Sequence, residues 1–235
     1  MNEEQYEGQR SAHSGQGDMP GWMATAQKQW KIYAGLAFVV TLVIAGMFWY
    51  TSNQETQNTE AATHLSRIRG VFELGEFETA LTADTISPVG QERVLGLLEI
   101  ADTYGSTDAG KVASLMAGNC LVNLGRYDEA RDRFQVSQSS GSAIIEVGSI
   151  QGLASCAEGS GDLAGAAELY EQAANKALKT GLEAPCLFRA GLCYERSGNN
   201  EKAAELYRIV AKQYEVSEVA PSAKTGLARL GMAID

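Results

Sequence analysis

The sequence predicts an all-α protein: a single transmembrane helix near the amino terminus, then a solenoid of helical hairpins that ends in a capping helix. Three observations carry this prediction. An uncharged apolar run covers residues 32–50, a glycine-turn pattern recurs three times in the second half, and the 235 residues include only 4 prolines. Alanine, leucine and glutamate dominate the second half, and these residues favour helices over strands.

The apolar run from Ile32 to Tyr50 contains no charged residue. As a helix it would be about 28 Å long, close to the roughly 30 Å of a bilayer's hydrocarbon core. Trp30 and Tyr33 lie at one end of the run, and Trp49 and Tyr50 lie at the other. Aromatic residues concentrate at both edges of a membrane, so these four side chains, together with Lys28 and Lys31 beside the run, are expected interface anchors.

A cleaved secretory signal is the main alternative for this run. About 30 residues precede it, it is longer than the usual 7–15 apolar residues of a signal, and the bulky residues 48–50 occupy the zone where small residues would mark a cleavage site. No cysteine lies near its end, so a lipid anchor is not expected. The sequence therefore favours an uncleaved signal anchor.

Charges beside the run predict its orientation. Lys28 and Lys31 come directly before it, whereas Glu55 and Glu60 precede the first basic residue after it, Arg67. Because basic residues stay on the cytoplasmic side, we expect a cytoplasmic amino terminus and a large domain across the membrane.

The predicted organisation is a disordered tail over 1–24, a transmembrane helix over 25–52, a juxtamembrane helix with a first degenerate hairpin over 53–84, and a solenoid over 85–235.

The second half of the chain repeats itself at several positions. The turn glycines are Gly125, Gly161 and Gly198. Seven residues before each lies a small residue, and these are Gly118, Ala154 and Gly191. Nine residues after each lies an aromatic residue, and these are Phe134, Tyr170 and Tyr207. A helix–turn–helix unit with a period near 34 residues is typical of tetratricopeptide (TPR) repeats.

Further helices are expected on both sides of these repeats. The segment Leu74–Ala80 has the same glycine, aromatic and alanine spacing, but its glycine lies too far before Gly125, so an extra helix is predicted over Gln91–Tyr104. The stretch before Leu74 is amphipathic, and it is expected to continue the transmembrane helix into this first unit. The segment Ala220–Leu230 is expected to cap the last repeat.

The four cysteines are expected to be reduced. Cys120, Cys156 and Cys193 each lie five residues before a turn glycine, so they occupy one position on three successive first helices. Packed helices are about 8–10 Å apart, whereas a disulfide requires Cα atoms within about 7 Å. Cys186 lies seven residues from Cys193 along one helix, which is also too far. These residues therefore look like small apolar core residues.

The sequence offers no candidate for catalysis. Neither His13 nor His64 has a nucleophile in register, and the motifs of phosphate-binding loops, serine hydrolases and zinc proteases are absent. No metal site, cofactor or small-molecule substrate is therefore predicted. The net charge of −10 argues against nucleic acid as a partner, because phosphate binding needs a basic surface.

Binding of a protein is the remaining function class. The first helices of stacked hairpins line the concave side of a TPR solenoid, where a peptide or a helix can bind. The repeat register places these candidates there: Leu115, Asn119, Val122, Gln151, Ser155, Phe188, Leu192 and Glu195. Asn119 and Arg189 are similar to part of the clamp with which some TPR domains hold a terminal carboxylate. Glycine and glutamine occupy its other positions, so no such clamp is predicted.

The whole architecture resembles the YfgM-type ancillary subunits of the SecYEG translocon. The likeness extends to the stretch 102–115, which contains Thr-Tyr-Gly and precedes a repeat, and to a later helix–turn–helix over Ile144–Ala166. The resemblance implies a non-enzymatic protein of the inner membrane with a periplasmic TPR domain. It implies the translocon and a PpiD-like chaperone as partners, and a role in passing exported proteins to periplasmic chaperones.

An alternative is a TPR scaffold for envelope assembly or cell division, similar to CpoB or BamD. Proteins of that kind are cleaved or lipidated and have no transmembrane helix, so the anchor distinguishes the two hypotheses.

Overall fold

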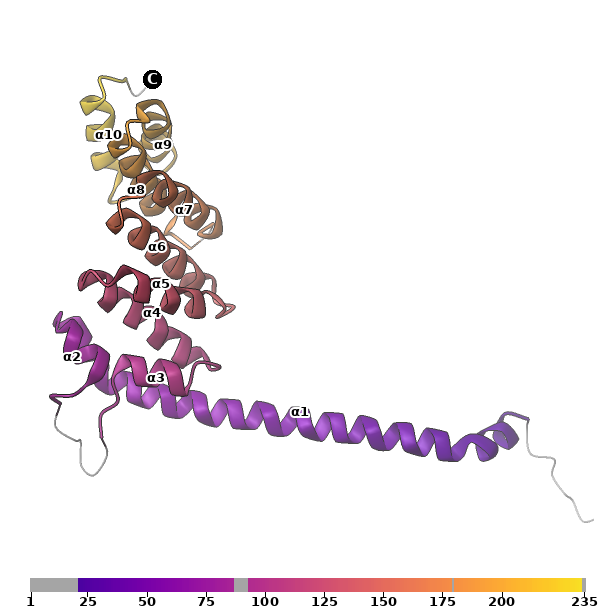
Figure 1. Ribbon diagram of the computed structural model, residues 1–235. Coiled ribbons are helices and arrows are strands. Elements are labelled where there is room, and N and C mark those ends of the chain that lie inside the picture. Colours follow the sequence, from indigo (N-terminus) through magenta and orange to yellow (C-terminus); the bar gives the residue numbers. More distant parts are fainter. Residues whose placement is uncertain (1–20, 87–92, 179, 234–235) are drawn as a thin grey trace, which may run out of the picture. The chain divides into compact units, whose positions relative to one another are not determined.

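The computed structural model describes residues 21–86, 93–178 and 180–233, and within them it contains ten helices and no strand (Figure 1). The predicted all-α fold is therefore confirmed. The chain divides into two compact units at Thr51 and Ser52. Of the predicted cytoplasmic tail, residues 1–20 lie outside the described residues.

Helix α1 (Gly21–Glu73) contains the apolar run. It is long and apolar enough to cross a membrane, and the side chains from Ile32 to Tyr50 are exposed. The expected interface residues Trp30, Tyr33, Trp49 and Tyr50 are between 58% and 70% exposed. The side chains of Lys28 and Lys31 lie outside the described residues.

The second unit begins at Ser52 and includes the last turns of α1. Three hairpins follow one another along it, and the last helix packs against the third hairpin (Figure 1). Its other helices are α2 (Phe77–Thr82), α3 (Leu97–Thr103), α4 (Asp108–Asn123), α5 (Tyr127–Gln138), α6 (Ala143–Gly159), α7 (Leu163–Lys176), α8 (Glu183–Arg196), α9 (Asn200–Gln213) and α10 (Ala220–Arg229).

Each hairpin turns on a glycine with positive φ, as predicted. At Gly125 φ is 74°, and its N–H donates to Val122 O at 3.0 Å while the next N–H, of Arg126, donates to Leu121 O at 2.8 Å. This pair of hydrogen bonds ends the helix. The positive φ that the turn requires would strain any residue with a side chain, so glycine is favoured there. The same two bonds and a positive φ recur at Gly75, Gly161, Gly198 and Gly231.

The buried aromatic ring of the first hairpin lies between one glycine of that hairpin and one glycine of the next. A Cβ atom would lie 2.6 Å from the Phe134 ring at Gly118, and 2.3 Å from it at Gly152 on the following hairpin. Phe134 is fully buried, so its ring fits only because both helices lack a side chain there. Tyr207 lies in the same way between Gly191 and Gly226.

Helix α10 therefore occupies the position of a first helix. Its Gly226 accommodates Tyr207 as Gly152 accommodates Phe134, and Gly231 ends it with the turn used by the other first helices. Its outward residues are polar or small, and its buried ones are Ala220, Ala223, Gly226 and Leu227. The predicted capping helix is confirmed, because a terminal element with a polar outer face closes a solenoid.

The extra helix before the first complete hairpin is shorter than predicted. Helix α3 starts at Leu97 rather than at Gln91. A Cβ atom at Gly96 would lie 2.3 Å from Leu81 O, so the extended chain at Gly96 passes directly against the end of α2. Val94 reaches the core from this extended segment, not from a helix.

Within the second unit, the last turns of α1 belong to the core. Leu65 and Ile68 are buried there, which is the amphipathic stripe that the sequence shows. Asn58 Oδ1 accepts the Ala109 N–H at 2.8 Å, while Thr107 Oγ1 accepts the Gly110 N–H at 3.0 Å. These two side chains cap the start of α4, because the first N–H groups of a helix have no partner within it.

Candidate protein-binding surface

The residues predicted to line a binding groove all lie on the first helices of the three hairpins. We call this set the first-helix face, and each of its side chains is half-buried. A half-buried side chain both packs against its neighbours and remains accessible to a partner. The set comprises Leu115, Asn119 and Val122 on α4, Gln151 and Ser155 on α6, and Phe188, Leu192 and Glu195 on α8.

The apolar members of this face support the packing of successive hairpins. A Cβ atom at Gly148 on α6 would lie 3.4 Å from Leu115 Cδ2, so Leu115 reaches across to the next first helix. The rings of Phe188 and Tyr207 have centroids 5.7 Å apart. Val122 and Leu192 pack against the edges of the core. Part of the surface of each of these apolar side chains is therefore buried by packing within the protein.

The polar members hold contacts within and between hairpins. Gln151 Nε2 donates to Cys186 Sγ at 2.8 Å, and Ser155 Oγ lies 3.0 Å from Tyr170 Oη. The backbone oxygen of Asn119 accepts a hydrogen bond from Asn123 Nδ2 at 2.8 Å. The first two bonds restrict the side chains of Gln151 and Ser155, whereas the third restricts Asn123 and leaves the Asn119 side chain unspecified.

Two ion pairs, which the sequence analysis missed, link successive first helices. Glu158 on α6 pairs with Arg196 on α8, and Glu195 on α8 pairs with Arg229 on α10. Each glutamate lies three residues before its turn glycine, and each arginine lies two residues before the next one. The repeat alignment could have found this pattern, but the pairing itself depends on how the hairpins stack.

The Glu195 pair has more hydrogen bonds than the Glu158 pair. Arg229 Nε and Nη2 donate to the two oxygens of Glu195 at 2.5 and 2.6 Å, and Tyr207 Oη donates to Glu195 at 2.7 Å. Arg229 holds the pKa of Glu195 below its ordinary value. Burial, and next the neighbouring carboxylate, raise the pKa of Tyr207. Glu195 is therefore a charged acceptor and Tyr207 a neutral donor at neutral pH.

The first hairpin has apolar residues at the same positions. Val122 replaces the glutamate, Phe134 replaces the tyrosine, and Gly159 replaces the arginine of the next helix. A Cβ atom at Gly159 would lie 2.3 Å from the Tyr127 ring, so no longer side chain fits there without a shift. At these equivalent positions the stack is thus apolar between α4 and α6 and ionic between α6, α8 and α10.

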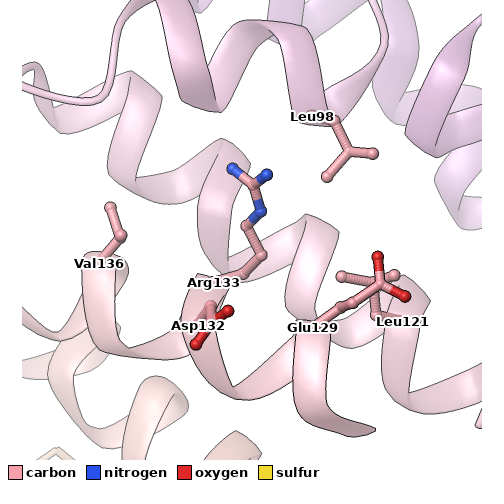
Figure 2. Close-up of a pocket in the computed structure, with 6 residues that line it drawn as sticks. All are labelled: Leu98, Leu121, Glu129, Asp132, Arg133 and Val136. Atoms are coloured by element: carbon pink, nitrogen blue, oxygen red, sulfur yellow. The ribbon is translucent and has the colours of Figure 1, made fainter. Parts of the chain in front are cut away.

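A cavity of about 280 Å³ lies on another side of the second unit, between α3 and α5 (Figure 2). Leu98, Leu121 and Val136 supply its apolar lining, and Arg133 rises from α5 beside them. Arg133 pairs with Asp102. The cavity shares no residue with the first-helix face, and one of its charged residues, Arg133, links α5 to α3.

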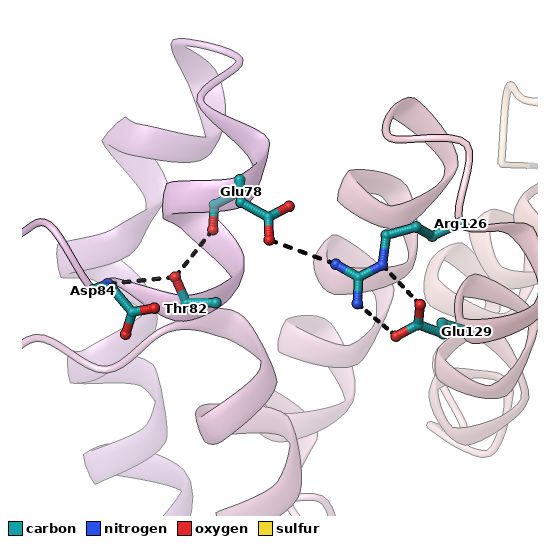
Figure 3. Close-up of polar contacts among 5 residues, drawn as sticks. All are labelled: Glu78, Thr82, Asp84, Arg126 and Glu129. Carbon is teal, nitrogen blue, oxygen red and sulfur yellow. Dashed lines mark hydrogen bonds and ion pairs between the residues drawn. The ribbon is translucent and has the colours of Figure 1, made fainter.

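Arg126 joins the short helix α2 to the first hairpin. Its Nε and Nη2 donate to Glu129 at 2.7 and 2.6 Å, and its Nη1 lies 3.7 Å from Glu78 on α2 (Figure 3). Exposed pairs of this kind contribute little stability, about 0–1 kcal/mol. Helix α2 is held mainly by its buried residues Ala80 and Leu81, and the exposed pair adds a link to the first hairpin.

The cysteines are buried and unpaired, as the repeat register predicts. Burial raises the pKa of Cys120 to about 12 and that of Cys193 to about 11, and it also raises the pKa values of Cys156 and Cys186. The thiolate is the reactive form, so these thiols are inert at neutral pH.

His64 lies against an aromatic residue. The His64 ring stacks on Tyr104 with centroids 6.1 Å apart, and the residue is half-buried. Within the described part of the chain, no group of three or more histidine, cysteine, aspartate or glutamate residues could hold a metal ion.

Comparison with known families identifies the repeats. The sequence model of the tetratricopeptide repeat family matches residues 112–138 and 186–215, which cover most of the first and third hairpins. The α6–α7 hairpin lies between the two matched segments and has the same turn. No curated protein and no solved structure matches the chain. The chain therefore contains TPR repeats, a fold that is typically a non-catalytic scaffold for protein–protein interaction.

Proposed function

We propose that this protein is a membrane-anchored adaptor whose first-helix face binds a partner protein. The observation that carries the proposal is the half-burial of all eight predicted residues, which come from three successive first helices. Stacked first helices of repeat proteins provide extended surfaces for peptides and helices. The accessible parts of these side chains are mixed apolar and polar, which suits a protein segment.

We place the anchor in the inner membrane with the amino terminus in the cytoplasm and the TPR domain in the periplasm. Lys28 and Lys31 before the run, against Glu55 and Glu60 after it, support this orientation. The exposed apolar side chains between Ile32 and Tyr50 support insertion, because such a surface is unfavourable in water.

The proposed partners are the SecYEG translocon, near the anchor, and a PpiD-like chaperone on the TPR domain. The adaptor would help to pass exported proteins to periplasmic chaperones, and it would carry out no reaction itself. The resemblance in architecture to the YfgM-type subunits supports these partners. A scaffold for envelope assembly or cell division similar to CpoB or BamD is the second candidate, and the membrane-length helix disfavours it.

Site-specific photo-crosslinking in native membranes tests the proposal. A photoreactive amino acid is placed in the full-length chain at Asn119 or Gln151 on the first-helix face. Matched control positions are Gln135 on α5 and Gln172 on α7, both exposed on second helices. We expect discrete adducts from the first pair alone, with translocon or chaperone subunits identified in them by mass spectrometry.

Two results would count against the proposal. Equal adducts at all four positions would show that the first-helix face is not the binding surface. Adducts that contain only division or outer-membrane assembly proteins would support the second candidate function instead.

A further inference from the structure

Arg189 is a cation that the fold holds in place on the first helix of the third hairpin. Its guanidinium lies over the Tyr170 ring, 5.4 Å from the centroid, and Nη1 donates to Tyr170 Oη at 2.9 Å. Ser155 Oγ on the preceding first helix is 3.5 Å from the same nitrogen. Stacking and these bonds limit the rotamers of a long side chain that is otherwise exposed.

The charge of Arg189 is not neutralised by a direct partner. Among the contacts of residues 21–86, 93–178 and 180–233, its guanidinium forms no ion pair, whereas Arg133, Arg196 and Arg229 each form one. A guanidinium carries five N–H donors, and the printed contacts of Arg189 use one nitrogen. Donors therefore remain for a ligand.

The carboxylate that shares Tyr170 with Arg189 already has a partner. Glu158 Oε2 is 3.4 Å from Tyr170 Oη, and Glu158 forms its ion pair with Arg196. The group formed by Glu158, Arg189 and Arg196 thus has a net charge of +1 on a chain whose total is −10. At the next step of the solenoid, the opposite charges of Glu195 and Arg229 cancel each other.

No other repeat has a charge at this position. The residues nine before the turn glycines of the first two hairpins are Met116 and Gly152, and both are buried in the packing between hairpins. Arg189 is therefore not required by the repeat pattern.

We propose that Arg189 binds the carboxylate of an aspartate or glutamate side chain within a partner segment that lies along the first-helix face. This inference rests on the proposed function and adds the chemistry of the partner. Arg189 adjoins this face, because its Nη1 is 3.5 Å from Ser155 Oγ on α6 and Leu192 lies about one turn after it on α8. A segment can thus run past the cation, so we assign an internal acidic side chain with apolar neighbours rather than a chain terminus.

A peptide library tests this chemistry on the purified full-length protein in detergent micelles. Random segments are displayed in a loop joined to a carrier at both ends, so that no free terminus is present. We expect selected loops to contain aspartate or glutamate beside apolar residues. A synthetic peptide of a selected sequence, with blocked ends, is then measured by fluorescence anisotropy.

Variants on both sides of the contact provide the decisive measurement. Arg189→Gln should weaken peptide binding about tenfold or more, because a charge-assisted pair is lost. Replacement of the peptide's acidic residue by the corresponding amide should weaken binding to the wild-type protein to a similar extent. The same replacement should cause little further loss of binding to the Arg189→Gln variant. Tyr170→Phe, which removes the hydroxyl that holds the guanidinium, should cause a smaller loss. Arg208→Gln, on α9, is the matched control and should bind normally.

The proposal is overturned if Arg189→Gln binds the selected peptide as the wild type does, if selected loops lack acidic residues, or if binding requires a free terminal carboxylate. The amide variant of the peptide keeps the test independent of protein folding. Crosslinking of the peptide to Asn119 or Gln151 separates the two proposals. Adducts there with no effect of Arg189→Gln would reject this inference alone, and a lack of adducts there would also reject the first-helix face as the binding surface.

Discussion

The first and third hairpins have the same backbone and turn, yet three equivalent positions differ completely between them. The third hairpin has Glu195 and Tyr207, joined by Arg229 from the next helix, and the first has only apolar side chains there. Both hairpins nevertheless place an aromatic ring between two glycines. The comparison shows that these two hairpins share the ring between glycines, whereas the ionic link is an addition specific to later repeats.

The shared ring should account for the largest effect. Phe134→Ala is expected to destabilise the full-length protein by about 3–5 kcal/mol, because it leaves a cavity between two helices that cannot close around it. Chemical denaturation in detergent micelles, followed by circular dichroism, measures the change. Val136→Ala on the same helix, where the side chain is 43% exposed, is the control and should cost well under about 1 kcal/mol. A comparable loss for both variants would contradict the role assigned to the ring.

The ionic link of the third hairpin should have a smaller effect that depends on pH. Glu195→Gln is expected to cost about 1–3 kcal/mol at pH 7, because Arg229 and the Tyr207 hydroxyl lose a charged acceptor. Arg229 lowers the folded-state pKa of Glu195 below 4.5, so the stabilisation is present above the unfolded pKa and is lost as pH falls through the folded one.

Denaturation midpoints of the wild type and of Glu195→Gln should therefore converge below about pH 4. Val122→Ala, at the equivalent position of the first hairpin, should show a difference from the wild type that does not change with pH. A constant gap between the wild type and Glu195→Gln from pH 7 to pH 3 would show that Glu195 is not stabilised as a carboxylate.

Transfer of one polar group into the first hairpin should have the smallest effect. Phe134→Tyr is expected to cost about 1–2 kcal/mol, because the hydroxyl would meet Val122 instead of a glutamate. Val122→Glu in the same chain should recover part of this loss, which a double-mutant cycle of denaturation free energies would show as favourable coupling. Additive losses would indicate that the two hairpins differ in more than side-chain identity.

The repeat pattern in the sequence predicted most of the second unit correctly. Turn glycines, small residues and aromatic residues lie where their spacing places them, because local helix geometry and turn conformation are set within a single hairpin. The extra helix was predicted to start six residues too early, because its start is limited by the close approach of Gly96 to α2. That contact is between segments far apart in the chain, and periodicity carries no information about it.

The candidate binding surface was predictable in part. The register placed eight residues on first helices, and the structure shows them half-buried there. It did not indicate that Glu195 is already bonded to Arg229 within the chain, or that Arg189 stacks on Tyr170. Each of these contacts joins two hairpins, so it depends on the stacking distance and on the rotation between repeats.

By itself, the sequence determined a membrane-length apolar helix, three hairpins with glycine turns, and cysteines at one repeated position. These features follow from short-range rules: the length of an apolar run, the conformational freedom of glycine, and the period of a helix. Only the tertiary structure decided that Gly152 and Gly226 accept the aromatic ring of the preceding hairpin, that α10 acts as a final first helix, and which charges of successive first helices pair with one another. The physical reason is that such contacts arise between repeats, where packing brings together residues that are between half a repeat and one repeat apart in the sequence.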